Sequence, residues 1–174
     1  MSRPIAIFGL PQEKYVKKIF ALRQKLFSEG KMEEAELFTL PHLTILINSN
    51  LDDLVSNEFL IQKLKPFLNV IRQFNIPITE VEKFDNSIIA KFDNSFTRKL
   101  VSQMSSVLPG FRAITTDYIK VLRKVVPEHL DQVLEDTKKE LETEIVIDRV
   151  AMAGGTLRKE DLLWSAELLP KISK

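Results

Sequence analysis

The spacing of apolar residues changes along the chain between the period of a strand and that of a helix. Residues 4–10 form a short apolar run, which predicts a buried strand. Over residues 13–29 the apolar positions recur at helical spacing and Gly30 supplies a stop. The basic residues of this helix, Arg23 among them, are expected to lie mostly on its outer face.

The rest of the chain continues the alternation. Strand, helix and strand occur at 4–47 and again at 87–125, which predicts an α+β fold of two similar β-α-β lobes facing one another across a groove. The remaining predicted elements are a strand at 37–47 interrupted by Pro41, a turn at 48–50 with Asn50 as a helix cap, a helix at 54–74 kinked or broken by Pro66, paired strands at 76–84 and 87–92, a helix at 96–108, a strand at 111–126, a helix opening at Pro127, and strands at 143–152 and 162–169 around a Gly154-Gly155 turn.

Composition narrows the classes of function. With 174 residues the chain forms one domain or two small lobes sharing a core. The formal net charge is +1, so any phosphate binding must come from a local arrangement of charge. The chain has no cysteine, which excludes disulfides, thiol catalysis and cysteine-rich zinc sites and fits a reducing compartment. No signal peptide and no apolar run near the ~20 residues of a membrane span are visible, so we expect a cytosolic protein without membrane contact.

Of the two histidines, His42 is the candidate for chemistry. Alternation along its strand places His42, Thr44 and Leu46 on one face and the apolar residues between them on the core face. Imidazole titrates near neutral pH and suits proton transfer, and a threonine hydroxyl can donate to a phosphate oxygen. A structural histidine at a strand edge is the alternative for so short a motif. His129, near a helix N-terminus, is expected to be a solvated helix residue.

The motif Pro41-His42-Leu43-Thr44, preceded by a strand and a helix, resembles the 2H phosphoesterase superfamily, which includes 2′,5′ RNA ligase-like proteins and cyclic phosphodiesterases. By element order the resemblance covers essentially the whole chain, and it is specific at this one motif. It implies a single bilobal domain over 1–174 with a central groove. In the superfamily two H-x-T or H-x-S motifs, one per lobe, supply a general base and a general acid that act on a cyclic or 2′,5′ phosphodiester without a metal or other cofactor.

The second motif of the superfamily is expected on the strand 111–125, which contains no histidine. Matching the apolar positions places Tyr118 where the histidine belongs and Lys120 where the threonine belongs, with Ile119 and Val121 toward the core. Lys120 can neutralise a phosphate as a point charge. Tyr118 can donate a hydrogen bond or, less readily, a proton. An ordinary exposed strand face is the alternative for both residues.

Two functions follow from the resemblance. The first is a phosphodiesterase, a hydrolase of RNA-derived or cyclic nucleotides, in which His42 is the acid or base, Thr44 and Lys120 hold the phosphate and Tyr118 is a second proton donor. The second is a pseudoenzyme that binds RNA, a nucleotide or a protein partner. The retained Pro41-His42-Leu43-Thr44 favours the first function, and the missing second histidine favours the second.

Four other side chains are weaker candidates for binding a nucleic acid. Trp164 could stack on a base in the groove, although a tryptophan in a terminal strand is more often part of the core. Arg112, Arg123 and Lys124 flank the second groove strand and could hold a nucleic-acid backbone, or form a solvated rim. No cluster of metal-ligating residues is visible in the sequence, so no metal site is expected.

Overall fold

The computed structural model describes residues 2–108, 110–154 and 157–171. The strands of this part are β1 (Ser2–Pro11), β2 (Leu43–Asp52), β3 (Phe74–Phe84), β4 (Ser87–Phe92), β5 (Arg112–Ala113), β6 (Tyr118–Leu122), β7 (Glu144–Ala153) and β8 (Leu162–Glu167). The helices are α1 (Glu13–Ser28), α2 (Asn57–Leu68), α3 (Ser95–Ser105) and α4 (Leu130–Glu140), with 3-10 turns η1 (Glu34–Glu36), η2 (Pro127–His129) and η3 (Lys159–Asp161). The α+β class and the order of the main elements are as predicted.

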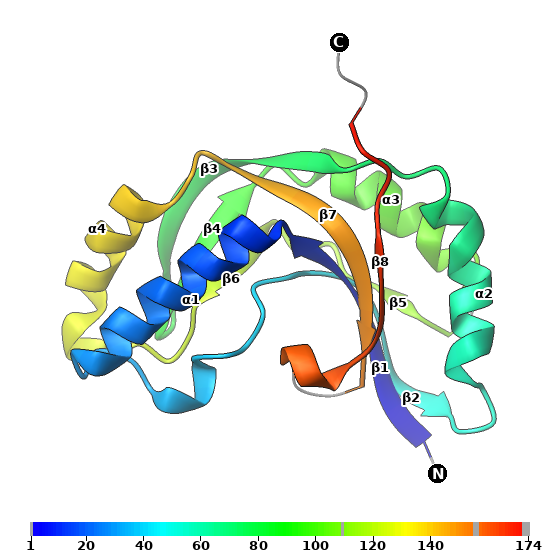
Figure 1. The fold of residues 1–174 in the computed structure, drawn as a ribbon, viewed down its shortest axis with the longest axis horizontal. Helices are drawn as coiled ribbons and strands as arrows, with labels where there is room; N and C mark the ends of the chain where they lie inside the picture. Colours follow the sequence, from blue (N-terminus) through cyan, green and yellow to red (C-terminus); the bar gives the residue numbers. More distant parts are fainter. Residues whose placement is uncertain (1, 109, 155–156, 172–174) are drawn as a thin grey trace.

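The strands form one antiparallel sheet, and β3 and β7 join its two halves. The strand order is β5-β2-β1-β7-β3-β4-β6, with β8 pairing with β7. Residues 74–77 of β3 pair with β7, whereas residues 78–84 pair with β4. In Figure 1 the long strands β3 and β7 arch between the two ends of the molecule, with α1 and α4 at one end and α2 and α3 at the other.

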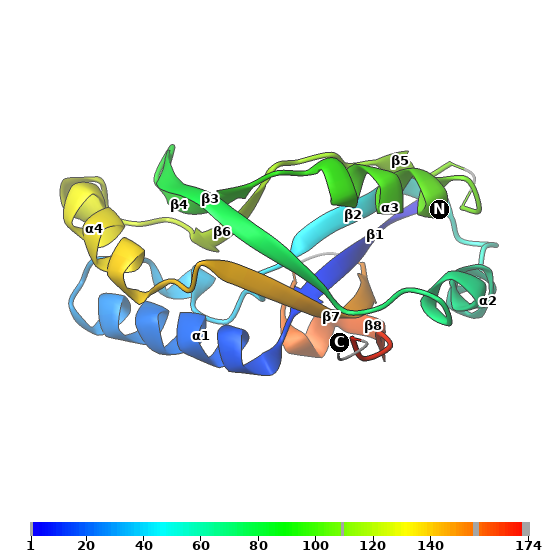
Figure 2. The ribbon, with the colours of Figure 1, turned by 90° about the horizontal axis from the view of Figure 1, so that it is seen from above.

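The helices of the two β-α-β halves are exchanged between the halves. Helix α1 follows β1 but contacts β6, and α3 follows β4 but contacts β2 and β5 (Figure 2). One buried apolar cluster accordingly includes side chains of both halves, such as Ile19 of α1 and Ile119 of β6. Since packing area is the main source of stability, each half depends on the helix that the other half supplies.

The end of α1 is formed as the sequence predicts. Gly30 has a φ of +69°, which glycine adopts without a steric cost. The Gly30 N–H donates to the Phe27 carbonyl at 2.9 Å and the Lys31 N–H to the Leu26 carbonyl at 2.8 Å. These are the two hydrogen bonds of a Schellman motif, and they turn the chain toward η1 and the residues before β2.

Strand β2 differs from the prediction at both ends. It begins at Leu43 and continues to Asp52, so His42 lies just before the strand and the predicted turn at 48–50 is part of it. Ile7 pairs with Leu46 and Phe8 pairs with Thr44, which leaves a bulge at the residue between them. An extra residue reverses the alternation, so Leu46 is fully buried and does not share the face of His42 and Thr44.

Three other predictions were wrong in detail. Helix α2 begins after Ser56, whose hydroxyl accepts the Phe59 N–H at 3.1 Å, so Asn50 is not its cap. Pro66 lies in the last turn of α2 and the helix ends at Leu68, so there is no second helical segment. The strand expected at 111–126 is reduced to β5 and β6. The predicted turn partner Gly155 lies outside the described residues.

Among the described residues, no helix has the length and apolar composition needed to cross a membrane.

Candidate active site

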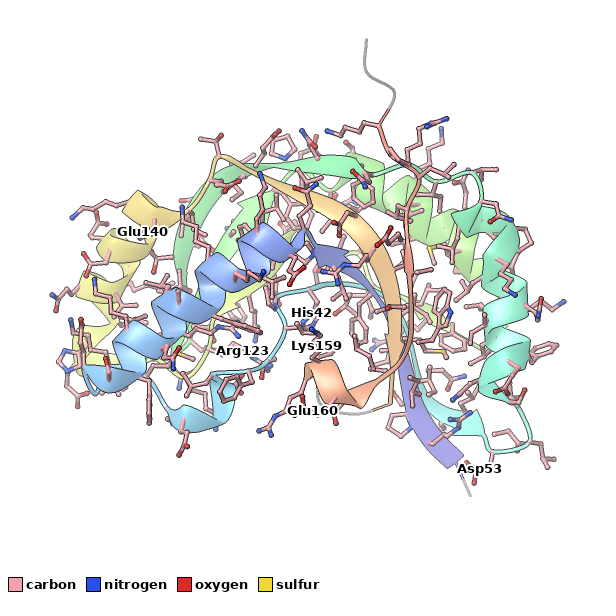
Figure 3. The ribbon with its side chains drawn as sticks, viewed as in Figure 1. His42, Asp53, Arg123, Glu140, Lys159 and Glu160 are labelled. Atoms are coloured by element: carbon pink, nitrogen blue, oxygen red, sulfur yellow. The ribbon has the colours of Figure 1, made fainter. Side chains whose placement is uncertain are left out.

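A cavity of about 170 Å³ lies between the start of β2 and β6, where the two halves of the sheet meet. His42 and Thr44 line it from one half, and Tyr118 and Lys120 line it from the other. Figure 3 shows His42 and Arg123 on the inner side of the arch, beside α1. The structure thus brings together all four side chains that the sequence singles out, although they come from segments more than 70 residues apart.

His42 is held in one orientation and is neutral at pH 7. Its Nδ1 lies 2.8 Å from the Leu40 carbonyl oxygen. Because a carbonyl only accepts, Nδ1 carries the proton and Nε2 keeps its lone pair. The ring also makes an edge contact with Phe8, with centroids 5.0 Å apart. Burial lowers the pKa of His42 to about 4, the Leu40 carbonyl opposes the shift, and the charges of Arg123, Arg23 and Lys120 add to it. The free imidazole is therefore a proton acceptor.

On the opposite wall, the predicted frame of β6 agrees with the burial of its residues. Ile119 and Val121 are fully buried, while Tyr118 and Lys120 are partly exposed and line the cavity. The Tyr118 ring stacks on Phe84, with centroids 5.8 Å apart. Lys120 Nζ lies 5.6 Å from the centroid of the same Phe84 ring, within the range of a cation–π contact. Phe84, at the end of β3 and 43% exposed, thus orders both predicted site residues.

Arg23 is not on the outer face of α1, as the sequence predicts, but is buried with 1% exposure. Its Nε and Nη2 donate to the Val121 carbonyl at 3.1 and 2.8 Å, and its Nη1 donates to the carbonyls of Glu36 and Thr39. Burial lowers its pKa to about 10, which Glu36 opposes, so it remains charged at pH 7. Its position four residues after Ile19, on the apolar face, was the signal for this burial.

The cavity has two further threonine side chains, Thr116 and Thr39, that sequence reasoning missed. Thr116 lines it and lies two residues before Tyr118, so alternation along the segment would have placed both on one face. Thr44 and Thr116 therefore present hydroxyl groups from the two halves. Thr39 and Leu40 also line the cavity.

Within the part of the chain that the structure describes, the lining carries positive charge and no carboxylate. Arg123, for which the sequence allows either a contact with a nucleic-acid backbone or a solvated rim, lines the cavity with Arg23 and Lys120, and its Nη1 lies 3.6 Å from Glu36 Oε2. Lys124 does not line it and pairs with Glu33 at 3.3 Å. Three cations around one small cavity form a site for an anion, although the net charge of the whole chain is only +1.

The other candidates do not reach this cavity. Arg112 is exposed on β5, His129 is half-buried at the end of η2, and Trp164 lines a different cavity. Within the described residues, no group of three or more histidine, aspartate or glutamate side chains is placed to hold a metal ion. Among the described residues, the polar groups that line the cavity are therefore one imidazole, three threonine side chains, one phenol and three cations.

No protein-family model matches the chain, and no curated protein matches it. Solved structures do match. E. coli LigT in complex with 3′-AMP superposes with a TM-score of 0.55 at 12% identity, over 96% of this chain and 98% of LigT. The chain has the LigT fold.

Two further structures agree with it. A phosphoesterase matches with a TM-score of 0.53 at 10% identity, over 96% of this chain and 99% of that one. A conserved protein of unknown function, ATU0111 from Agrobacterium tumefaciens str. C58, matches with a TM-score of 0.53 at 18% identity, over 97% of this chain and 86% of that one. LigT belongs to the 2H phosphoesterase family, so the fold predicted from the Pro-His-Leu-Thr motif is confirmed.

Proposed function

We propose that this chain is a 2H-type phosphodiesterase that acts on a nucleotide or RNA phosphodiester at the His42 cavity. The observation that carries the proposal is the shared cavity itself. A neutral imidazole from one half and Lys120 from the other line a space whose described lining has three cations in all, Lys120 among them, and no carboxylate. The LigT fold supports the same function, since LigT has been solved with 3′-AMP and with ATP.

The proposed roles follow from the protonation states. Nε2 of His42 accepts the proton of a water molecule as the water oxygen attacks phosphorus. Lys120 and Arg123 offset the negative charge that grows on the phosphate oxygens, and Thr44 and Thr116 donate hydrogen bonds to them. The ester P–O bond breaks, and the leaving oxygen takes a proton from Tyr118. The His42 imidazolium then returns its proton to the Tyr118 oxygen, which restores the site.

The alternative function is binding without turnover, by a catalytically inactive relative. It is favoured by one observation, that the wall opposite His42 carries the phenol of Tyr118 and, among the described lining residues, no second histidine. His42 has its only ring N–H bonded to Leu40, so it cannot serve as the acid at neutral pH. Such a protein would hold RNA, a nucleotide or, through another surface, a protein partner.

The test uses purified protein in EDTA with 2′,3′-cyclic nucleotides and with 2′,5′-linked oligoadenylate. Wild type is compared with His42→Ala, and His129→Ala serves as the matched control because His129 does not line the cavity. Removing a matched base typically lowers a rate ~10²- to 10⁴-fold, and we expect that loss in His42→Ala alone. Turnover by wild type no higher than by His42→Ala would reject the enzyme, and binding without turnover would support the alternative.

We also propose that residues 1–174 act as one bilobal domain, because β3 and β7 pair with strands of both halves and the helices are exchanged between them. The cytosolic location remains a proposal, supported by a composition without cysteine.

A further inference from the structure

A second and larger cavity, of about 540 Å³, lies beside the first, between α1, η3 and the strands β1, β7 and β8. Leu40 lines both cavities, and its carbonyl oxygen accepts the ring N–H of His42. Ligand pockets typically enclose ~300–1,000 Å³. At about 170 Å³ the first cavity is too small for a whole nucleotide, whereas the second cavity is within this range. Leu40, which lines the second cavity, lies two residues before His42, the proposed general base.

The inner wall of the second cavity is apolar. Leu10, Val16 and Leu40 belong to a small hydrophobic cluster that is separate from the main core, and Phe20 packs against that cluster. Trp164, the only tryptophan of the chain, lines the cavity as well and packs against the main core. The cavity therefore offers two aromatic side chains and an aliphatic surface to a ligand, which suits a planar base.

The rim of the second cavity is positively charged. Lys17, Arg149 and Lys159 line it together with a single carboxylate, Glu13. Lys17 pairs with Glu13 at 3.2 Å, and Arg149 pairs with Asp148 at 3.3 Å. In Figure 3, Lys159 projects from η3 toward the region of His42, whereas Glu160 lies on the far side of η3. An apolar wall below a cationic rim is complementary to a base that carries a phosphate.

We propose that the second cavity binds the nucleoside on one side of the scissile phosphate, so that the substrate is a linear dinucleotide or longer oligonucleotide rather than a cyclic mononucleotide. This inference rests on the proposed function of the His42 cavity. A phosphodiester in that cavity has two ester substituents, and the one directed past Leu40 enters the second cavity. Its base lies against Phe20 and Trp164, and the next phosphate along the strand meets Lys159 and Lys17.

The experiment compares 2′,5′-linked diadenosine monophosphate with 2′,3′-cyclic AMP in wild type, and it uses inorganic phosphate as the probe that is small enough for the His42 cavity alone. Binding is followed by stopped-flow fluorescence of Trp164, which reports on the second cavity before turnover, and by calorimetry. Ser165→Phe adds volume at a cavity position, and Leu163→Phe adds the same ring to β8 outside the cavity. Lys159→Ala removes a rim charge, and Lys139→Ala removes the same charge from α4.

We expect the dinucleotide to quench Trp164 and to bind about tenfold more weakly to Ser165→Phe and about fivefold more weakly to Lys159→Ala. Both control variants stay within about twofold of wild type, and all four variants bind inorganic phosphate as wild type does. Equal dinucleotide affinity in wild type and Ser165→Phe, with phosphate still bound, would contradict binding at the second cavity and leave the proposed function intact, and cyclic AMP bound as tightly as the dinucleotide would contradict the linear substrate. If folded wild type binds neither the dinucleotide nor phosphate, the proposed function fails and the inference fails with it.

Discussion

Two nitrogens of Arg23, Nε and Nη2, donate to the carbonyl oxygen of Val121, at 3.1 and 2.8 Å. Arg23 comes from α1 of one half of the molecule, and Val121 lies in β6 of the other. The remaining contacts of the guanidinium reach the Glu36 and Thr39 carbonyls, shortly before His42 in the chain. One side chain therefore connects the two walls of the candidate site.

Replacement of Arg23 by methionine is expected to destabilise the fold. It leaves the Glu36, Thr39 and Val121 carbonyls without these donors, and a buried polar group that loses its partner costs ~1–3 kcal/mol. We expect the free energy of unfolding, measured with urea, to fall by roughly 3 kcal/mol in Arg23→Met. Arg23→Lys should recover only part of it, because an ammonium lacks the planar fork. The exposed Arg98→Met is the control, and an Arg23→Met protein as stable as this control would contradict the assignment.

The protonation of His42 links stability to pH. Its pKa in the folded chain is about 4, below the ordinary 6.5, so between these values the unfolded chain binds a proton that the folded chain does not. Above pH 6.5 the shift does not change the free energy of unfolding, and as the pH falls toward 4 that free energy decreases by up to about 3 kcal/mol. Urea unfolding at pH 7 and pH 4 should show this loss in wild type and not in His42→Asn. An equal loss in both proteins would argue against a neutral, partly buried His42.

The low pKa of His42 also determines the pH below which the proposed activity decreases. A base with a pKa of about 4 stays unprotonated through weakly acidic pH. We therefore expect kcat/KM for a 2′,5′-linked dinucleotide to stay level from pH 7 down to about pH 5 and then to fall. A profile that declines already near pH 6.5 would show that His42 titrates as an exposed histidine.

Tyr118→His introduces a histidine at the position where the resemblance to the superfamily predicts the second one. The new imidazole would occupy the wall opposite His42, so turnover is expected to rise about 10²-fold, the low end of general acid–base catalysis. Tyr118→Phe keeps an aromatic ring beside Phe84 and removes only the hydroxyl, which makes it the matched comparison. If Tyr118→His is no faster than Tyr118→Phe in steady-state assays, the two walls are not aligned for paired catalysis.

Lys120→Ala is expected to weaken phosphate binding without unfolding the protein. Lys120 is partly exposed and lines the cavity, and loss of a charge-assisted hydrogen bond costs ~1.5–3 kcal/mol, or at least about tenfold in affinity. The inhibition constant of inorganic phosphate measures the effect, and its dependence on salt should become shallower. Lys91→Ala on β4 removes an equal charge that is paired with Glu82 at 2.8 Å and does not line the cavity. Equal inhibition constants for the two variants would show that Lys120 does not bind the phosphate.

The sequence by itself determined the order of the elements and the orientation of β6. Alternation requires only local information, so Ile119 and Val121 could be assigned to the core and Tyr118 and Lys120 to the groove before any contact was known. The short motif around His42 was likewise readable, because it lies in one continuous segment.

Only the tertiary structure decided how these segments meet. The bulge opposite Ile7 and Phe8 depends on the register between β1 and β2, and it reversed the face of Leu46. The burial of Arg23 depends on carbonyls 13 to 98 residues away, which no periodicity records. Periodicity indicates only which face of a helix or strand is apolar. A buried charge is tolerated only where backbone groups distant in sequence accept its hydrogen bonds, and the positions of those groups depend on the folded chain as a whole.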